Sequence, residues 1–60
     1  MKDAIERQLE ALRARIRRLA DEAAMFRATG RDAIADRCDN EHRQAEAEAS
    51  ALQRLLENAQ

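Results

Sequence analysis

A single glycine, Gly30, interrupts a chain of 60 residues that contains no proline. Glycine and proline are the strongest helix breakers, so the stretches on either side of Gly30 lack strong breakers. Glycine also suits the left-handed position just after a helix, where a β-carbon would be strained. These features predict two helices joined by a short turn. The competing structure is one continuous helix, in which Gly30 would cost about 1 kcal/mol.

The first half carries a regular apolar pattern. Apolar residues recur at alternating steps of four and three, which is the heptad seam by which one helix packs on another. This pattern predicts a helix over residues 2–29. The seam positions are Ile5, Leu9, Leu12, Ile16, Leu19, Ala23 and Phe26.

The second half predicts a helix over residues 32–58, which Asp32 is placed to cap. The intervening turn, residues 29–31, is short enough to fold the helices back on each other as an antiparallel hairpin. The expected fold class is therefore all-α, with residues 1–60 forming a single helical hairpin.

The apolar stripe of the second helix is weaker than that of the first. The predicted stripe passes through Glu41 and Glu48, and the only apolar residues between Cys38 and Leu52 are alanines. Alanine lets helices approach closely but buries little area. The stripe consists of Ile34, Cys38, Ala45, Leu52 and Ala59, widened by Leu55 and Leu56.

The composition limits the size of the core. Fourteen of the apolar residues are alanine, and only thirteen are larger. Chains this small usually need a disulfide, a metal or a partner, and a single cysteine cannot form an intrachain disulfide. We therefore predict that two hairpins form a homodimeric four-helix bundle, whose arrangement the sequence leaves open. The predicted dimer core is Ile5, Leu9, Leu12, Ile16, Leu19, Phe26, Ile34, Cys38, Ala45, Leu52, Leu55 and Leu56.

Several classes of protein are disfavoured. The chain has no valine and one aromatic residue, which argues against a sheet, and no apolar run approaches the roughly 20 residues of a membrane span. Cys38 and His42 share a helix face, but we interpret them as a small core residue and a half-exposed histidine. No nucleophile lies beside an obvious base. We expect no enzyme activity, no cofactor and no metal.

The charges are unevenly divided. Residues 1–30 carry seven basic and five acidic groups, and residues 31–60 carry four basic and seven acidic groups. Part of this is explained by pairs at helical spacing, which stabilise a helix by tenths of a kcal/mol. The alternative is a contact patch, because Arg suits carboxylates and phosphates, and an outward Met25 beside Phe26 suits a protein interface. The predicted helical pairs are Asp3–Arg7, Glu10–Arg13, Arg17–Asp21 and Arg18–Glu22, and the predicted partner-binding residues are Met25, Phe26, Arg27, Arg18, Arg17 and Arg13.

Residues 35–45 resemble the matching stretch of the Rop family, plasmid-borne RNA-binding helical hairpins. Ala35, Asp36, Cys38, His42 and Ala45 agree with that family. The resemblance implies a homodimeric four-helix bundle, and RNA binding through one face of the first helix. The positions of that face are Asp3, Glu10, Ala14, Arg18 and Met25 here, which lack the family's central aromatic residue.

We therefore predict a small, cytoplasmic regulatory protein that acts by binding a larger protein. It would serve as an inhibitor or adaptor of the kind that phages and plasmids encode. The alternative is an RNA-binding regulator that stabilises loop–loop complexes, as the resemblance implies. A net charge of −1 argues against DNA binding, and no membrane contact is expected.

Overall fold

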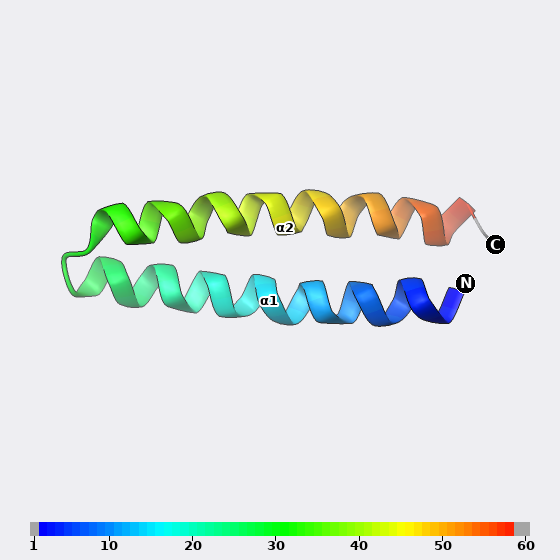
Figure 1. Ribbon diagram of the computed structural model, residues 1–60, viewed down its shortest axis with the longest axis horizontal. Helices are drawn as coiled ribbons and strands as arrows, with labels where there is room; N and C mark the ends of the chain where they lie inside the picture. The colour runs from blue at the N-terminus through cyan, green and yellow to red at the C-terminus, as the bar shows by residue number, and fades with distance from the viewer. Residues whose placement is uncertain (1, 59–60) are drawn as a thin grey trace.

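The computed structural model describes residues 2–58 and consists of two antiparallel helices (Figure 1). Helix α1 runs from Lys2 to Ala28, and helix α2 runs from Asp32 to Asn58. The molecule is a rod 46 Å long, with both described chain ends opposite the turn. The all-α hairpin is therefore confirmed. Within the described residues, neither helix is both long and apolar enough to cross a membrane.

The turn is built around Gly30, which has a φ of +76°. The N–H of Arg31 donates to the carbonyl of Phe26 at 2.7 Å, and the N–H of Gly30 donates to that of Arg27 at 3.1 Å. This pair of bonds is the Schellman motif, in which a left-handed residue lets the chain leave the helix with its last carbonyls satisfied. Helix α1 consequently ends one residue before its predicted limit.

The first hydrogen bond of helix α2 joins the N–H of Ala35 to the carbonyl of Arg31 at 3.1 Å. Arg31 therefore holds the capping position, and Asp32, the predicted cap, is the first residue of the helix. A carboxylate in the first turn still stabilises the helix, because it lies near the positive end of the helix dipole.

The seam of α1 lies where the sequence pattern predicted it. Every predicted seam position is turned toward α2, and none is fully exposed. Leu9, Leu12, Leu19 and Ala23 are buried, and Ile5, Ile16 and Phe26 are half-buried.

The seam of α2 differs from the predicted stripe at every second position. Cys38, Ala45, Leu52 and Leu56 belong to both, but the positions between Cys38, Ala45 and Leu52 are shifted by one along the chain, as is the first position. Ile34, Glu41, Glu48 and Leu55, which the stripe contained, are exposed in the hairpin, and Ala59 lies outside the described residues. The observed seam is Ala35, Cys38, His42, Ala45, Ala49, Leu52 and Leu56, of which Ala35, Cys38 and Ala45 are buried and the others half-buried.

The shifted register is explained by packing large side chains on small ones. The two seams are mirror images about the turn, so positions equally far from the turn lie at the same height. Phe26 lies at the height of Ala35 and Leu12 at the height of Ala49, where the predicted stripe has Ile34 and Glu48 instead. Ala35 has 0% of its surface exposed, and Ala49 is half-buried. The alanines of α2 therefore form the sockets into which the large residues of α1 pack, as close packing requires.

Candidate functional site

The two broad faces of the hairpin differ in character, and the seams define them. A helix turns by about 100° per residue, so residues that directly follow a seam residue lie to one side of the seam and residues that directly precede one lie to the other. In an antiparallel pair, residues that follow the seam residues of both helices lie on one face of the hairpin, and residues that precede them lie on the other. We call the face formed by residues that directly follow a seam residue the bridged face. We call the face formed by residues that directly precede a seam residue the open face.

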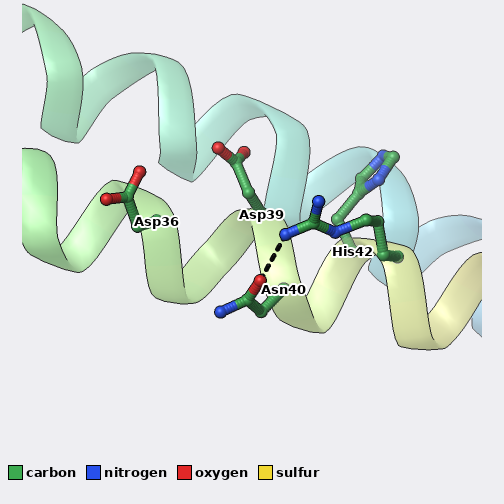
Figure 2. A pocket seen from close by; sticks show the side chains of 5 residues that line it. Asp36, Asp39, Asn40 and His42 are labelled. Carbon is green, nitrogen blue, oxygen red and sulfur yellow. Dashed lines mark hydrogen bonds between the residues drawn. The ribbon is translucent and has the colours of Figure 1, made fainter.

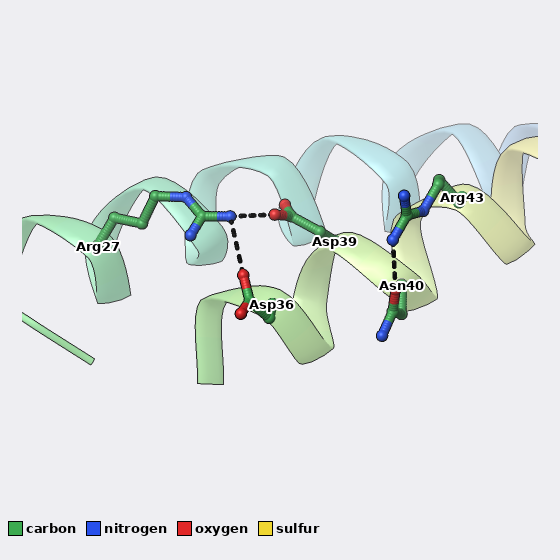
Figure 3. A network of polar contacts seen from close by, with 5 residues as sticks. All are labelled: Arg27, Asp36, Asp39, Asn40 and Arg43. Carbon is green, nitrogen blue, oxygen red and sulfur yellow. Dashed lines mark hydrogen bonds and ion pairs between the residues drawn. The ribbon is translucent and has the colours of Figure 1, made fainter. Parts of the chain in front are cut away.

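The bridged face carries the side-chain contacts that join the helices near the turn (Figure 3). The Arg27 guanidinium donates from α1 to the Asp36 carboxylate at 3.4 Å and to the Asp39 carboxylate. All three residues directly follow a seam residue. Because these groups are exposed, the ion pairs contribute at most about 1 kcal/mol. Their main effect here is to pair Arg27 with α2, where the sequence had suggested a partner-binding role.

Next to this network lies a shallow polar hollow on α2 (Figure 2). Arg43 donates to the Asn40 side chain at its rim, and the Nδ1 atom of His42 lies 3.2 Å from the Glu46 carboxylate. This contact is the one expected for a half-exposed histidine. Within residues 2–58, no three His, Cys, Asp or Glu side chains are grouped as metal ligands would be.

Two further hollows lie on the bridged face toward the chain ends, and Arg13 lines both. Its guanidinium donates to the Gln53 side chain of α2 at 3.2 Å. Leu9 lines both hollows and Leu56 lines one of them, which gives them a partly apolar wall. An arginine fork above apolar side chains is suited to an acidic protein surface.

The structure separates the predicted partner-binding residues onto the two faces and, for Phe26, into the seam between them. Arg13 and Arg17 directly follow Leu12 and Ile16, so they lie with Arg27 on the bridged face. Arg18 and Met25 directly precede seam residues and lie on the open face, seven residues apart on one stripe. The six predicted residues, Met25, Phe26, Arg27, Arg18, Arg17 and Arg13, therefore do not form one continuous patch.

The two neighbours Met25 and Phe26 have different environments. Phe26 is half-buried against the cluster of Leu19, Ala23 and Cys38, so it belongs to the hairpin core. Met25 has 53% of its surface exposed and has no part in that cluster. The carbonyl of Met25 accepts from the Thr29 hydroxyl at 3.2 Å, but its side chain faces solvent.

The open face carries the large apolar residues that the hairpin does not cover. Met25 on α1 is joined there by two residues of α2, Ile34 at 38% exposed and Leu55 at 55% exposed. All three directly precede a seam residue. Met25 and Ile34 lie together near the turn, and Leu55 lies at the other end of α2, so the face carries exposed apolar groups at both ends of the rod. Positions beside a helix seam are where a further helix can pack.

Charges near the seam, three of the four on the open face, influence the one cysteine. Burial raises the pKa of the Cys38 thiol above its ordinary value; Glu22 on α1, and Glu41 and Asp39 on α2, raise it further, and Arg37 opposes them. The influence of both Glu22 and Glu41 indicates that the carboxylates of the two helices lie near each other on this face. A thiol that stays protonated is a poor nucleophile, so Cys38 acts as a small core residue.

The raised pKa predicts a stability loss at alkaline pH. The folded chain holds the thiol proton more tightly than the unfolded chain, so the stabilisation is full below the unfolded thiol pKa of about 8.5 and is lost as pH rises through the folded value. Urea unfolding between pH 7 and pH 10 should show this decline for the native chain, whereas Cys38→Ala should show a flatter profile. Identical alkaline slopes for the two proteins would contradict the assignment.

Among the residues that the structure describes, none of the ion pairs predicted within α1 is formed. The pairs within 4 Å are Arg27–Asp36, Arg27–Asp39 and His42–Glu46, of which the first two join different helices. Contacts between the helices, including Arg13 to Gln53, are what the sequence reasoning missed. One feature of the sequence could have indicated these contacts: each residue that takes part in them directly follows an apolar seam residue.

Comparison of the chain with protein-family models, with curated proteins and with solved structures finds no match. The resemblance of residues 35–45 to the Rop family therefore stays a prediction. The arguments for function come from the two faces of the hairpin.

Proposed function

We propose that this chain is a small non-enzymatic regulatory protein that acts by protein–protein binding. It works as a homodimeric hairpin that docks on a larger partner and inhibits or tethers it. The observation that supports this is the exposure of Met25, Ile34 and Leu55 on one face of a hairpin whose own seam is already packed. Because all three lie at positions beside a helix seam, they favour contact with another protein chain over a role in the hairpin core.

The bridged face offers the larger partner a docking position of different chemistry. Arg13 and Arg17 lie four residues apart on α1, which is one helical turn. Arg13 stands over hollows lined in part by Leu9 and Leu56. Glu6 and Glu10 also line one hollow and Glu57 lines the other, so this surface carries both charge signs. It favours a partner that pairs an acidic side chain with Arg13 and inserts an apolar side chain beside Leu9.

Affinity capture from the native host tests this function. The tagged native protein should recover one specific protein in near-stoichiometric amount, and Arg13→Glu should reduce the recovery about tenfold, because one arginine at an interface centre is worth more than 1 kcal/mol. Arg7→Glu is the matched control, since Arg7 neither precedes nor follows a seam residue. Recovery of no protein by the native chain, or equal losses in both variants, would count against the proposal.

RNA binding is the alternative that the Rop resemblance implies. It predicts a salt-sensitive mobility shift of structured RNA that is lost when Arg13, Arg17 and Arg18 are all changed to Glu. Two features favour protein binding instead. Arg27 is paired with carboxylates, and Arg18 lies on the opposite face from Arg13 and Arg17, so the arginines do not form one basic surface.

A further inference from the structure

The open face has the position of a helix-packing surface. In a four-helix bundle each helix contacts two neighbours, which lie about 90° apart around its axis. On each helix of this hairpin one neighbour is already present along the seam. Residues that directly precede seam residues lie about 100° from them, which is where a second neighbour would pack. Met25, Ile34 and Leu55 occupy such positions and remain exposed.

The charged residues at the centre of this face are complementary between α1 and α2. The mirror relation of the seams places Arg15 of α1 near the height of Glu48 of α2, and Arg18 near the height of Glu41. The offset is two residues in each case, or roughly 3 Å along the axis, away from the turn for Glu48 and toward the turn for Glu41. A basic residue of α1 therefore matches an acidic residue of α2 at both heights.

Closer to the turn the match continues with the signs reversed. Glu22 of α1 lies near the height of Arg37 of α2, and Met25 lies near the height of Ile34. Within two residues of the same height, the open face thus pairs opposite charges three times, apolar with apolar once, and like charges once, because Glu22 lies as near to Glu41 as to Arg37. A predominance of opposite pairs along a helix pair favours that choice of partner helix.

We propose that a second copy of this chain covers the open face with both turns at the same end of the bundle. Helix α1 of each copy then packs against α2 of the other, which pairs Arg15, Arg18 and Glu22 with Glu48, Glu41 and Arg37, leaves one like-charge approach of Glu22 to Glu41, and buries Met25 against Ile34 of the other copy. This inference deepens the proposed function, since it rests on the chain acting as a homodimer and assigns the face and the orientation.

The reverse orientation, with the turns at opposite ends, is disfavoured by charge. It would pack α1 on α1, so that Arg15 at the middle of the helix faces its own counterpart and Arg18 lies within one turn of that second Arg15. It would also pack α2 on α2, bringing Glu41 of one copy near Glu48 of the other. Like charges facing each other across a helix interface oppose association, and opposite charges favour it.

The complementary charges are not used within one hairpin. The ion pairs of the described residues involve Arg27 with Asp36 and Asp39, and His42 with Glu46. None of the six charges of the open face, Arg15, Arg18, Glu22, Arg37, Glu41 and Glu48, is among them. These six side chains are therefore available to form ion pairs with a second hairpin.

Distance measurement between the two turns tests the orientation. A spin label at Arg31→Cys, in a Cys38→Ala background, reports the turn-to-turn distance by pulsed electron resonance. We expect a distance of about 20 Å, which corresponds to neighbouring helices roughly 10 Å apart plus the label arms. A distance of about 40 Å, the length of a 27-residue helix, would overturn the orientation. Absence of dipolar coupling would overturn the dimer.

A charge reversal gives a second test in the native-cysteine background. Arg18→Glu should raise the dimer dissociation constant about tenfold, because it places a second carboxylate beside Glu41 of the other copy at two symmetry-related sites. Adding Glu41→Arg should restore the affinity. Arg17→Glu is the matched control, as Arg17 lies on the bridged face. Sedimentation equilibrium measures all four proteins, and circular dichroism at each concentration checks that they are folded.

The opposite orientation predicts the opposite sign. There Arg18→Glu would remove repulsion between the α1 helices and tighten the dimer, so a lower dissociation constant would overturn the proposal. A native chain that sediments as a folded monomer at 100 µM would do the same (about a hundredfold above a micromolar dissociation constant). These measurements use purified protein alone, so their failure is distinguishable from failure to capture a larger partner.

Discussion

Ala45→Asp is expected to abolish folding of the hairpin. Ala45 has 0% of its surface exposed and lies at the height of Ile16, so a carboxylate there would be buried beside apolar groups with no partner. An uncompensated buried charge costs about 3–5 kcal/mol. A domain of this size rarely has more than about 3–5 kcal/mol of stability. Far-ultraviolet circular dichroism at 25 °C should therefore show loss of most of the helical signal.

Ala47→Asp is the matched control for this change. Ala47 lies two residues further along the same helix and is exposed. The same substitution there should cost only the helix propensity of aspartate, about 0.7 kcal/mol, and leave the helical signal intact. If the two variants were equally helical, the assignment of Ala45 to the seam of α2 would be wrong.

Leu19→Ala is expected to have the next largest effect. Leu19 is 6% exposed and forms one cluster with Ala23 and Cys38, against which Phe26 packs. Truncating a buried leucine removes its transfer free energy and leaves a cavity, which together cost about 2–5 kcal/mol. Urea unfolding should show the corresponding loss in the free energy of unfolding. Helices this short depend on tertiary packing, so partial unfolding at 25 °C is expected.

Leu55→Ala provides the comparison for Leu19→Ala, because it removes the same atoms from an exposed leucine. In the hairpin alone, Leu55 has 55% of its surface exposed, so the truncation should cost well under half as much. If Leu55 is part of the dimer face, its effect should also shrink as the protein is diluted, whereas the effect of Leu19→Ala should not. A loss for Leu55→Ala as large as that for Leu19→Ala in dilute solution would contradict the burial assignment.

Much of the fold was predictable because the chain has a single glycine and no proline, so the position of the helix break is unambiguous. Gly30 and the absence of proline predicted two helices and the turn between them, and the structure agrees. The seam of α1 was predictable for a similar reason. Its positions are marked by large apolar residues from Ile5 to Phe26, and no other stripe of that helix has comparable residues.

The candidate site was less predictable, because it depends on the relation between two helices. Helical spacing suggested pairs within α1, but the observed contacts of Arg13 and Arg27 reach across to Gln53, Asp36 and Asp39. A one-helix pairing rule cannot detect them. The same limitation grouped Arg13 with Arg18 because they are close in sequence, although they lie on opposite faces.

Local features of the chain are sufficient to specify the two helices, the turn and the seam of α1, since glycine placement and large apolar residues act over short stretches. The register of α2 depends instead on packing between the helices. Two stripes share Cys38, Ala45 and Leu52, and neither is marked by large residues between them. Packing selects one of the two, because the large side chains of α1 need alanines opposite them. That choice leaves Ile34, Glu41, Glu48 and Leu55 on the open face, where we propose that a second copy binds.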